Sequence, residues 1–303
     1  MNGIMNMGLP KLFEMLERDS EWVNYYYDVE NKFPHLSASI GKKPQNMPKN
    51  RYCNVWPWNH SRVVLGRSPD YINASHIKSP IVNHQYIASQ EPLSGRNEST
   101  KDDFWRMVWE QNCSVIIMLN DPSENNSYNS AKYYPYFPTG QQDYTEYTGK
   151  EGIKVSLLSR EIKNCYFYSK LELSLEGKPP REIHHLQYKG WGDYEVPDSA
   201  ATEFFEFLKE ARDLFESYPG PPIVHCSAGV GRTGTFILAD VILEIAKERK
   251  SLNVDVKEVL EKLREQRMWL VQTPDQIRFC FMAIVEGVKK LDLTEFAEDR
   301  VNV

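Results

Sequence analysis

The sequence lacks the features of a membrane-bound, secreted or nucleic-acid-binding protein. No apolar run approaches the roughly 18 residues that a membrane-spanning helix needs. Residues 1–13 have no cationic start followed by an apolar core, so we expect no signal peptide. The net charge is −6, whereas nucleic acids and membrane surfaces attract proteins with a basic face. We therefore expect neither nucleic acid nor a membrane as a partner.

A disulfide framework and a metal-binding pattern are also missing. The five cysteines are odd in number and widely spaced: Cys53, Cys113, Cys165, Cys226 and Cys280. Their spacing matches no set of metal ligands, so we expect no metal and no other cofactor. Except for Cys226, they are expected to be small core residues. Unpaired cysteines favour a reducing compartment, and we predict a cytoplasmic protein with access to the nucleus.

No internal repeat, low-complexity segment or linker-like change of composition interrupts the chain. Of its 303 residues, 26% are charged and 41% are hydrophobic, which is ordinary for a globular protein. We predict one domain over residues 1–303, acting as a monomer. Residues 1–31 have helical spacing and are expected to form a helical lid, and residues 295–303 to form a short charged tail.

The apolar periodicity predicts alternating helices and strands. An amphipathic helix is expected over residues 101–111, and the continuous apolar run 115–119 is typical of a strand buried on both faces. A helix followed by a buried strand implies an α/β layering. The remaining expected elements are a meander of strands at 153–158, 165–174 and 181–188, and helices at 200–217, 254–268 and 274–290.

The stretch around which the chain is organised is residues 224–234, Val-His-Cys-Ser-Ala-Gly-Val-Gly-Arg-Thr-Gly. It reads as a buried strand, a glycine-rich turn and a helix that opens near Thr233. Backbone N–H groups at such a turn, together with the positive end of the helix dipole, attract an anion. This stretch, called the cradle below, is therefore predicted to bind phosphate.

The cradle also carries the groups for nucleophilic chemistry. Cys226 lies at its base and is expected to attack phosphorus as a thiolate. Arg232 can grip two phosphate oxygens with its planar fork. Thr233 can offer its hydroxyl to the sulfur when it leaves. His225 should point to the other side of the strand and tune the loop by hydrogen bonding. The reaction further needs a general acid.

Five blocks of the sequence, in this order, resemble motifs of the cysteine-dependent protein tyrosine phosphatases. They are residues 49–52, 70–75, 104–109, 225–234 and 272–276. The likeness is to small, single-domain, non-receptor members, and it suggests that this chain is a compact fungal enzyme of that kind. The resemblance implies a highly twisted mixed central sheet flanked by helices and a phosphoric monoester hydrolase that dephosphorylates tyrosine in signalling or cell-cycle control.

The resemblance supplies the missing acid. Residues 191–197, Trp-Gly-Asp-Tyr-Glu-Val-Pro, are similar to the family's mobile loop, in which Trp-Pro-Asp is usual. Asp193 would then be the general acid and base. Gly192 replaces the proline, which adds backbone freedom and should raise the cost of ordering the closed loop.

The resemblance also implies how substrate is held. Tyr52 and Val55 would line a deep slot that only a phosphotyrosine side chain can span. Asn54 stands where the family often has an aspartate that orients the peptide. Phosphate would be held by Arg232 and by the loop residues Ser227, Ala228, Gly229, Val230 and Gly231.

Supporting residues follow from the same likeness. Gln272 and Gln276 would position the hydrolytic water, and Glu124 would brace the cradle arginine. Asn129 stands where relatives have a lysine. Trp269 and Glu30 occupy the positions that build a second phosphotyrosine pocket in some relatives. Because tryptophan is bulky and glutamate repels phosphate, we expect no preference for tandem phosphotyrosine.

Two other functions compete with hydrolysis of phosphotyrosine. One is a phosphotyrosine-binding pseudophosphatase with weak turnover, which Gly192, Asn54 and Asn129 leave open. The other is a dual-specificity phosphatase or a sulfur-transfer enzyme with a similar cysteine loop, although those lack the block around Tyr52. The expected partners are tyrosine-phosphorylated proteins, with protein kinases as the family-level candidate class.

Overall fold

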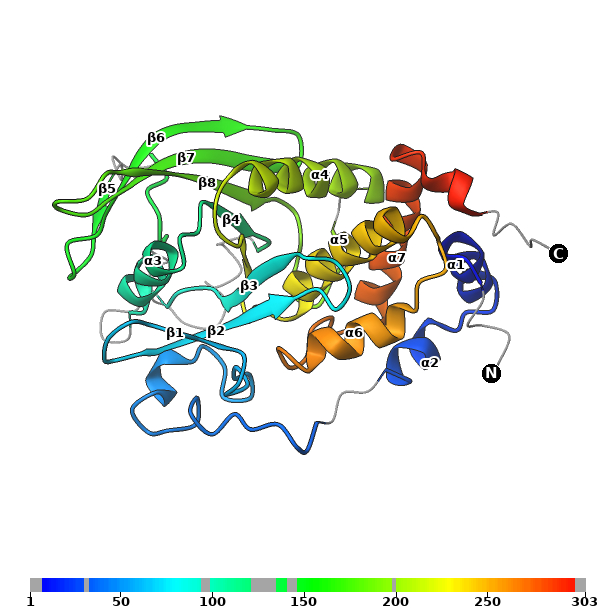
Figure 1. The fold of residues 1–303 in the computed structure, drawn as a ribbon, viewed down its shortest axis with the longest axis horizontal. Coiled ribbons are helices and arrows are strands. Elements are labelled where there is room, and N and C mark those ends of the chain that lie inside the picture. Colours follow the sequence, from blue (N-terminus) through cyan, green and yellow to red (C-terminus); the bar gives the residue numbers. More distant parts are fainter. Residues whose placement is uncertain are drawn as a thin grey trace.

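A mixed sheet of nine strands runs through the residues that the structure describes, which are 7–29, 33–93, 99–120, 135–140, 146–197 and 200–297 of the computed structural model. Helices cover both faces of this sheet (Figure 1). The strands are β1 (Arg62–Val64), β2 (Tyr71–Lys78), β3 (Gln85–Gln90), β4 (Val115–Met118), β5 (Glu146–Thr148), β6 (Lys154–Ile162), β7 (Tyr166–Ser174), β8 (Arg181–Tyr188) and β9 (Ile223–Cys226). The α-helices are α1 (Leu9–Arg18), α2 (Trp22–Tyr27), α3 (Lys101–Glu110), α4 (Ala201–Ser217), α5 (Gly231–Arg249), α6 (Val256–Arg264) and α7 (Pro274–Lys290), and the short 3-10 helices are η1 (Met47–Lys49) and η4 (Leu293–Ala297).

Strand β9, which leads into the cradle, lies in the middle of the sheet. The strand order is β1-β2-β3-β9-β4-β8-β7-β6-β5, and β9 is parallel to both of its neighbours. Its register pairs Cys226 with Gln90 of β3 and His225 with Met118 of β4. Because β9 is paired on both edges and buried on both faces, it can hold Cys226 rigidly.

Each face of the sheet has its own core. On one face α4, α5 and α7 pack together, and the N-terminal helices α1 and α2 lie against α7 (Figure 1). On the other face α3 buries Phe104, Trp105 and Val108. Helix α5 is buried nearly all round, because it runs between the sheet and the other helices. This arrangement confirms the predicted fold class, a mixed central sheet flanked by helices.

The helix boundaries differ from the sequence expectation in two places that matter for the site. Helix α5 begins at Gly231 rather than near Thr233. The helix expected over 254–268 ends at Arg264, because the Arg264 guanidinium donates to the carbonyls of Leu270 and Val271 and turns the chain back. Helix α7 matches its predicted bounds, with Pro274 in its first turn and Thr273 as its cap.

Helix η4 includes the first residues of the segment 295–303, which the sequence predicted to be a tail. Among the described residues, no helix combines the length and the apolar character that crossing a membrane requires.

Candidate active site

The cradle starts at the C-terminal end of β9, where Cys226 is only 3% exposed. Residues 227–230 form the turn, and α5 follows at once. Gly229 has φ +72°, and a Cβ at this position would lie 2.1 Å from the carbonyl oxygen of Ser89. Glycine is therefore required at this point of the turn, both for backbone conformation and for space.

Arg232 in the first turn of α5 connects the cradle to the loop at 191–197, called the acid loop below. Its Nη1 donates to the carbonyl of Trp191 at 2.6 Å, and its Nη2 lies 3.3 Å from Oδ1 of Asp193. The arginine side chain is 1% exposed, whereas that of Asp193 is 48% exposed. Thr233 follows in the helix, and its buried hydroxyl makes no hydrogen bond to any residue that the structure describes.

The acid loop is held at its base and exposed at its tip. The Trp191 side chain is 1% exposed, and its Nε1 donates to the carbonyl of Glu195 at 2.8 Å. The Glu195 N–H donates in turn to the carbonyl of Gly192. Tyr194 has φ +61° and is 60% exposed. A tight turn therefore carries Asp193 to the cradle arginine.

Gln272 and Gln276 lie on the other side of the cradle. Thr273 caps α7 by accepting from the Gln276 N–H at 3.1 Å, and the Gln276 side-chain oxygen accepts from the Gln272 N–H at 2.8 Å. A Cβ at Gly231 would lie 2.6 Å from Oε1 of Gln272 and 3.0 Å from Oε1 of Gln276. Both side-chain amides therefore lie next to Gly231 of the cradle, and their role in positioning water stays a prediction.

Tyr52 contacts the cradle directly. Its hydroxyl shares a hydrogen bond of 2.7 Å with Oγ of Ser227. Burial raises the pKa of the Tyr52 hydroxyl, and the bond to Ser227 offsets part of that rise. Val55 is 5% exposed, and Asn54 is exposed to solvent. Of the expected slot residues, Tyr52 therefore lies against the cradle.

The His225 side chain lies on the other face of the sheet from Cys226, as expected, against Tyr136 and Phe104. Its Nε2 shares a 2.7 Å hydrogen bond with the Tyr136 hydroxyl, and its Nδ1 lies 3.4 Å from the Cys226 carbonyl. The same hydroxyl is 2.7 Å from Nε2 of His185. Burial lowers the pKa of His225 to about 3, so the imidazole is neutral at physiological pH.

Arg267 is a site residue that sequence reasoning missed. Its Nε donates to the carbonyl of Gly229 at 2.7 Å, and its Nη2 donates to the carbonyl of Ala228 at 3.0 Å. Burial lowers its pKa to about 10, so it stays charged at neutral pH. By donating to two carbonyls of the turn, Arg267 fixes the backbone of the cradle. Nothing in the sequence pattern separates this arginine from a surface one.

Comparisons with known proteins agree with this geometry. The sequence model of the family described as protein-tyrosine phosphatase matches residues 46–286. The chain is 39% identical over 282 residues to the human tyrosine-protein phosphatase non-receptor type 2, covering 91% of this chain and 65% of that protein. It is 38% identical to the rat protein of the same name over 290 residues, covering 94% of this chain and 67% of that protein. It is 35% identical to the Drosophila melanogaster non-receptor type 61F over 295 residues, covering 92% of this chain and 51% of that protein.

The chain belongs to the protein-tyrosine phosphatase family. The predicted family, fold class and enzyme class are thereby confirmed. The chain spans about two thirds of the length of the mammalian relatives that it matches. The roles of individual residues stay predictions, and Glu124, Asn129 and Glu30 lie outside the described residues.

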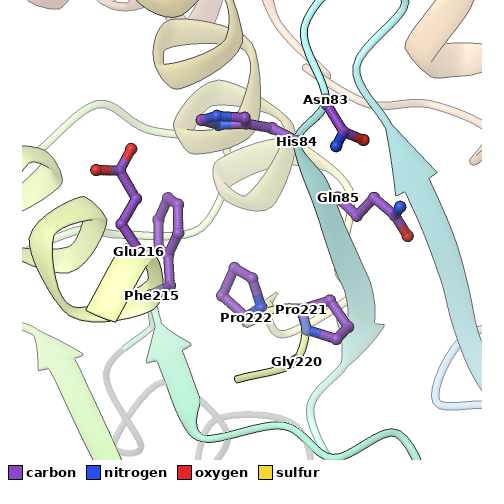
Figure 2. A pocket seen from close by; sticks show the side chains of 8 residues that line it. All are labelled: Asn83, His84, Gln85, Phe215, Glu216, Gly220, Pro221 and Pro222. Atoms are coloured by element: carbon purple, nitrogen blue, oxygen red, sulfur yellow. The ribbon is translucent and has the colours of Figure 1, made fainter. Parts of the chain in front are cut away.

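A separate cavity of this phosphatase lies far from the cradle, at the opposite end of β9. It has a volume of ≈ 370 Å³, and Phe215, Pro221 and Pro222 form its apolar wall. Figure 2 shows the His84 ring and the Glu216 carboxylate approaching one another above these rings. Pro222 precedes β9, whereas Cys226 ends it, so the cavity takes no part in the active site.

The polar rim of this cavity raises the question of a metal. His84, Glu216 and Glu244 place ligand atoms within 4.8 Å of one another. Arg212 already binds all three residues: its Nη1 lies 3.0 Å from His84 Nδ1 and 3.0 Å from Glu216 Oε1, and its Nε lies 3.4 Å from Glu244 Oε1. A metal ion would have to displace the guanidinium, so we interpret the group as an ion cluster around Arg212.

Proposed function

We propose that this chain hydrolyses phosphotyrosine in proteins through a cysteinyl-phosphate intermediate, with Cys226 as the nucleophile. The observation that carries the proposal is the position of Arg232. This single guanidinium stands at the rim of the cradle, six residues after Cys226, and binds the acid loop through Trp191 and Asp193. It can therefore hold phosphate and bring the proton donor to the same place.

In the first step the Cys226 sulfur attacks phosphorus, and the bond from phosphorus to the tyrosine oxygen breaks. The protonated Asp193 carboxyl gives its proton to that oxygen, so tyrosine leaves neutral. Arg232 and the N–H groups of the turn bind the phosphoryl oxygens throughout. Electrostatic stabilisation of this kind is the largest single contribution in many enzymes.

In the second step water attacks the thiophosphate, and the bond from phosphorus to sulfur breaks. Asp193, now a carboxylate, accepts a proton from the water, and phosphate leaves. Gln272 and Gln276 face Gly231, which is the side from which they can position this water. The buried Thr233 hydroxyl is available to donate to the departing sulfur.

Specificity for phosphotyrosine follows from the height of Tyr52 above the cradle. The bond between Tyr52 and Ser227 fixes an aromatic wall beside the phosphate site, and a phosphoserine side chain is too short to reach past such a wall to Cys226. Asn54 can still accept a hydrogen bond from the substrate backbone, but without the charge of an aspartate. We propose that the slot and not the cradle selects tyrosine.

The physiological setting is proposed on the same basis. The substrates are tyrosine-phosphorylated proteins, with kinases as a candidate class. Single phosphotyrosines suffice, because the resemblance puts the bulky Trp269, which is 44% exposed, where some relatives open a second pocket. We propose a monomer, folded as one domain over residues 1–303. The cytoplasm with access to the nucleus is the proposed location.

A second candidate is a phosphotyrosine-binding protein with weak turnover. The feature that favours it is Gly192, because a flexible residue next to Asp193 weakens positioning of the acid. In that case phosphotyrosine peptides bind tightly while hydrolysis remains slow even at saturation.

Turnover and binding together test both candidates. We expect wild-type enzyme to hydrolyse para-nitrophenyl phosphate and a phosphotyrosyl peptide in the presence of EDTA. Cys226→Ser should abolish hydrolysis and retain peptide binding. The matched control is Cys53→Ser, at an exposed cysteine next to the slot, which should retain hydrolysis. Hydrolysis that survives in Cys226→Ser contradicts the proposed nucleophile, and binding without turnover in the wild type favours the second candidate.

A further inference from the structure

A buried ion pair that the proposed reaction does not use lies behind the substrate slot. Arg51 precedes Tyr52 in the chain, and its Nη2 lies 3.4 Å from Oε2 of Glu91. The side chain of Glu91 is 1% exposed and that of Arg51 is 16% exposed. A buried carboxylate is costly close to a site that must attract phosphate, because its charge repels the ligand. An ion pair buried at this place is therefore expected to serve the substrate slot or the cradle.

The pair closes a ring of contacts with the cradle. The Glu91 N–H donates to the carbonyl of Ser227 at 3.1 Å. The hydroxyl of the same serine is bonded to Tyr52, which is covalently joined to Arg51. The Arg51 guanidinium also donates to the carbonyls of Glu91 and Pro92. The ring runs from Tyr52 through Arg51, Glu91 and Ser227 back to Tyr52, so the slot wall and the phosphate loop are fastened to each other.

The neighbouring residue ties this ring to the nucleophile. Gln90 lies opposite Cys226 in the register of β3 and β9. Its Oε1 accepts from the Arg51 N–H at 2.9 Å, and its Nε2 donates to the Lys49 carbonyl at 2.8 Å. The slot segment is thus attached to the same strand end that pairs with Cys226.

We propose that Glu91 is a positioning residue that sets the height of the Tyr52 wall above Cys226, and that Arg51 neutralises it so that the cradle still attracts phosphate. The inference rests on the proposed function, because the slot selects phosphotyrosine only in that setting. The two residues therefore have different roles. Glu91 affects recognition of the aromatic ring, whereas removal of Arg51 alone leaves the negative charge of Glu91 to repel an anion in the cradle.

The first test separates slot from cradle by ligand binding in the Cys226→Ser background, measured by calorimetry. Phosphotyrosine probes slot and cradle together, and tungstate probes the cradle alone. Glu91→Gln and Glu91→Ala should weaken phosphotyrosine binding about tenfold, the alanine variant more, and change tungstate binding less than about twofold. Equal losses for both ligands, or no loss for phosphotyrosine, overturn the positioning role.

The second test removes the charge of Arg51 alone and then the charges of Arg51 and Glu91 together. Arg51→Met should weaken tungstate binding about tenfold, because the Glu91 carboxylate then faces the anion without the guanidinium. Adding Glu91→Gln to Arg51→Met should restore tungstate binding but not phosphotyrosine binding. If the double variant binds tungstate no better than Arg51→Met, the neutralising role is wrong. Because Glu91→Gln keeps the shape of the side chain, it remains informative if Arg51→Met folds poorly.

A control variant checks the specificity of the effect, and a comparison of binding with turnover separates this inference from the proposed function. Asp103→Asn removes a charge from the nearby ion pair between Lys49 and Asp103, 2.9 Å apart and outside the ring, and should leave both ligands unaffected. Binding does not depend on turnover. If the wild type binds phosphotyrosine without hydrolysing it, the proposed function fails while the role of Glu91 can stand. If it hydrolyses normally and the Glu91 variants bind like their parent, only the inference fails.

Discussion

The cradle and the acid loop meet at Arg232 but are built in opposite ways. Cys226 and Arg232 are almost wholly buried, and the turn between them is held through main-chain atoms by β3 and by Arg267. In the acid loop Asp193 and Tyr194 are exposed at the tip, whereas Trp191 and Pro197 at its two ends are buried. The proposed phosphate-binding element is thus part of the core, whereas the proposed proton-transfer element is a surface turn attached to it.

This difference separates two kinds of catalytic contribution. Phosphate binding depends on backbone groups whose geometry the whole sheet determines, so the cradle cannot change without loss of stability. The position of the acid depends on a few contacts of one loop, so it can change with little effect on the fold. Substitutions in the acid loop should therefore alter kcat, whereas substitutions in the cradle should alter anion binding and stability together.

The largest expected effect is that of Asp193→Ala. Loss of the general acid should lower kcat by about 10² to 10⁴-fold. Tungstate binding should be retained or strengthened, because Arg232 loses a partner 3.3 Å away. Steady-state kinetics and calorimetry check this. A loss of tungstate binding that matches the loss of kcat would remove the distinction between the two regions.

Gly229→Ala should damage the cradle itself. An alanine would adopt φ +72° at a cost of about 1–2 kcal/mol, and its Cβ would meet the Ser89 carbonyl oxygen at 2.1 Å. We expect an unfolding free energy lower by more than about 2 kcal/mol and tungstate binding weaker by at least about tenfold.

Gly177 offers a matched control for that prediction. It also has a positive φ, +72°, but a Cβ there would meet nothing within 4 Å. Gly177→Ala should therefore show only the conformational cost and leave tungstate binding unchanged. Similar losses of stability in both variants, measured by urea unfolding, would mean that contact with Ser89 is not what constrains the cradle.

The cradle should also make stability depend on pH. Burial lowers the pKa of His225 to about 3 from a usual value of 6.5. As the pH falls below about 6.5, His225 becomes protonated in the unfolded chain but stays neutral in the folded one. Stability is therefore lost on acidification until the pH approaches about 3. Between pH 6.5 and 4.5 this should amount to about 2 kcal/mol.

Urea unfolding at several pH values checks this prediction by difference. His225→Asn should have a shallower loss of stability on acidification than the wild type, although it is less stable at neutral pH. His60→Asn, at an exposed histidine, is the control and should follow the wild type. Parallel curves for wild type and His225→Asn would contradict the buried neutral state.

The smallest expected effect is that of Gly192→Pro in the acid loop. A proline restricts the loop before it closes, which should raise kcat about two- to fivefold. The added side chain would meet Oε2 of Glu195 at 2.2 Å, but that carboxylate is the exposed end of a side chain that can move. The double variant with Glu195→Ala relieves the contact. An unchanged kcat in both variants would show that glycine does not limit this loop.

Much of the site was predictable because its groups are close together in the sequence. Cys226, Arg232 and Thr233 lie within one strand, turn and helix start, so local backbone geometry and residue type already indicate an anion site. The pattern around Asp193 and Tyr52 is equally local, and the family resemblance assigned those residues their roles. Helix α7 was predictable to its ends, since Thr273 and Pro274 mark its start in the sequence itself.

The sequence by itself therefore determined the fold class, the cradle and the class of chemistry. Only the tertiary structure decided what holds the cradle in place: Arg267 behind its carbonyls, Tyr136 against His225, and the ring through Arg51 and Glu91. The physical reason is that a buried charged or polar side chain depends on partners distant in the sequence. Its residue type alone predicts a place on the surface, and only the folded sheet brings the compensating groups to it.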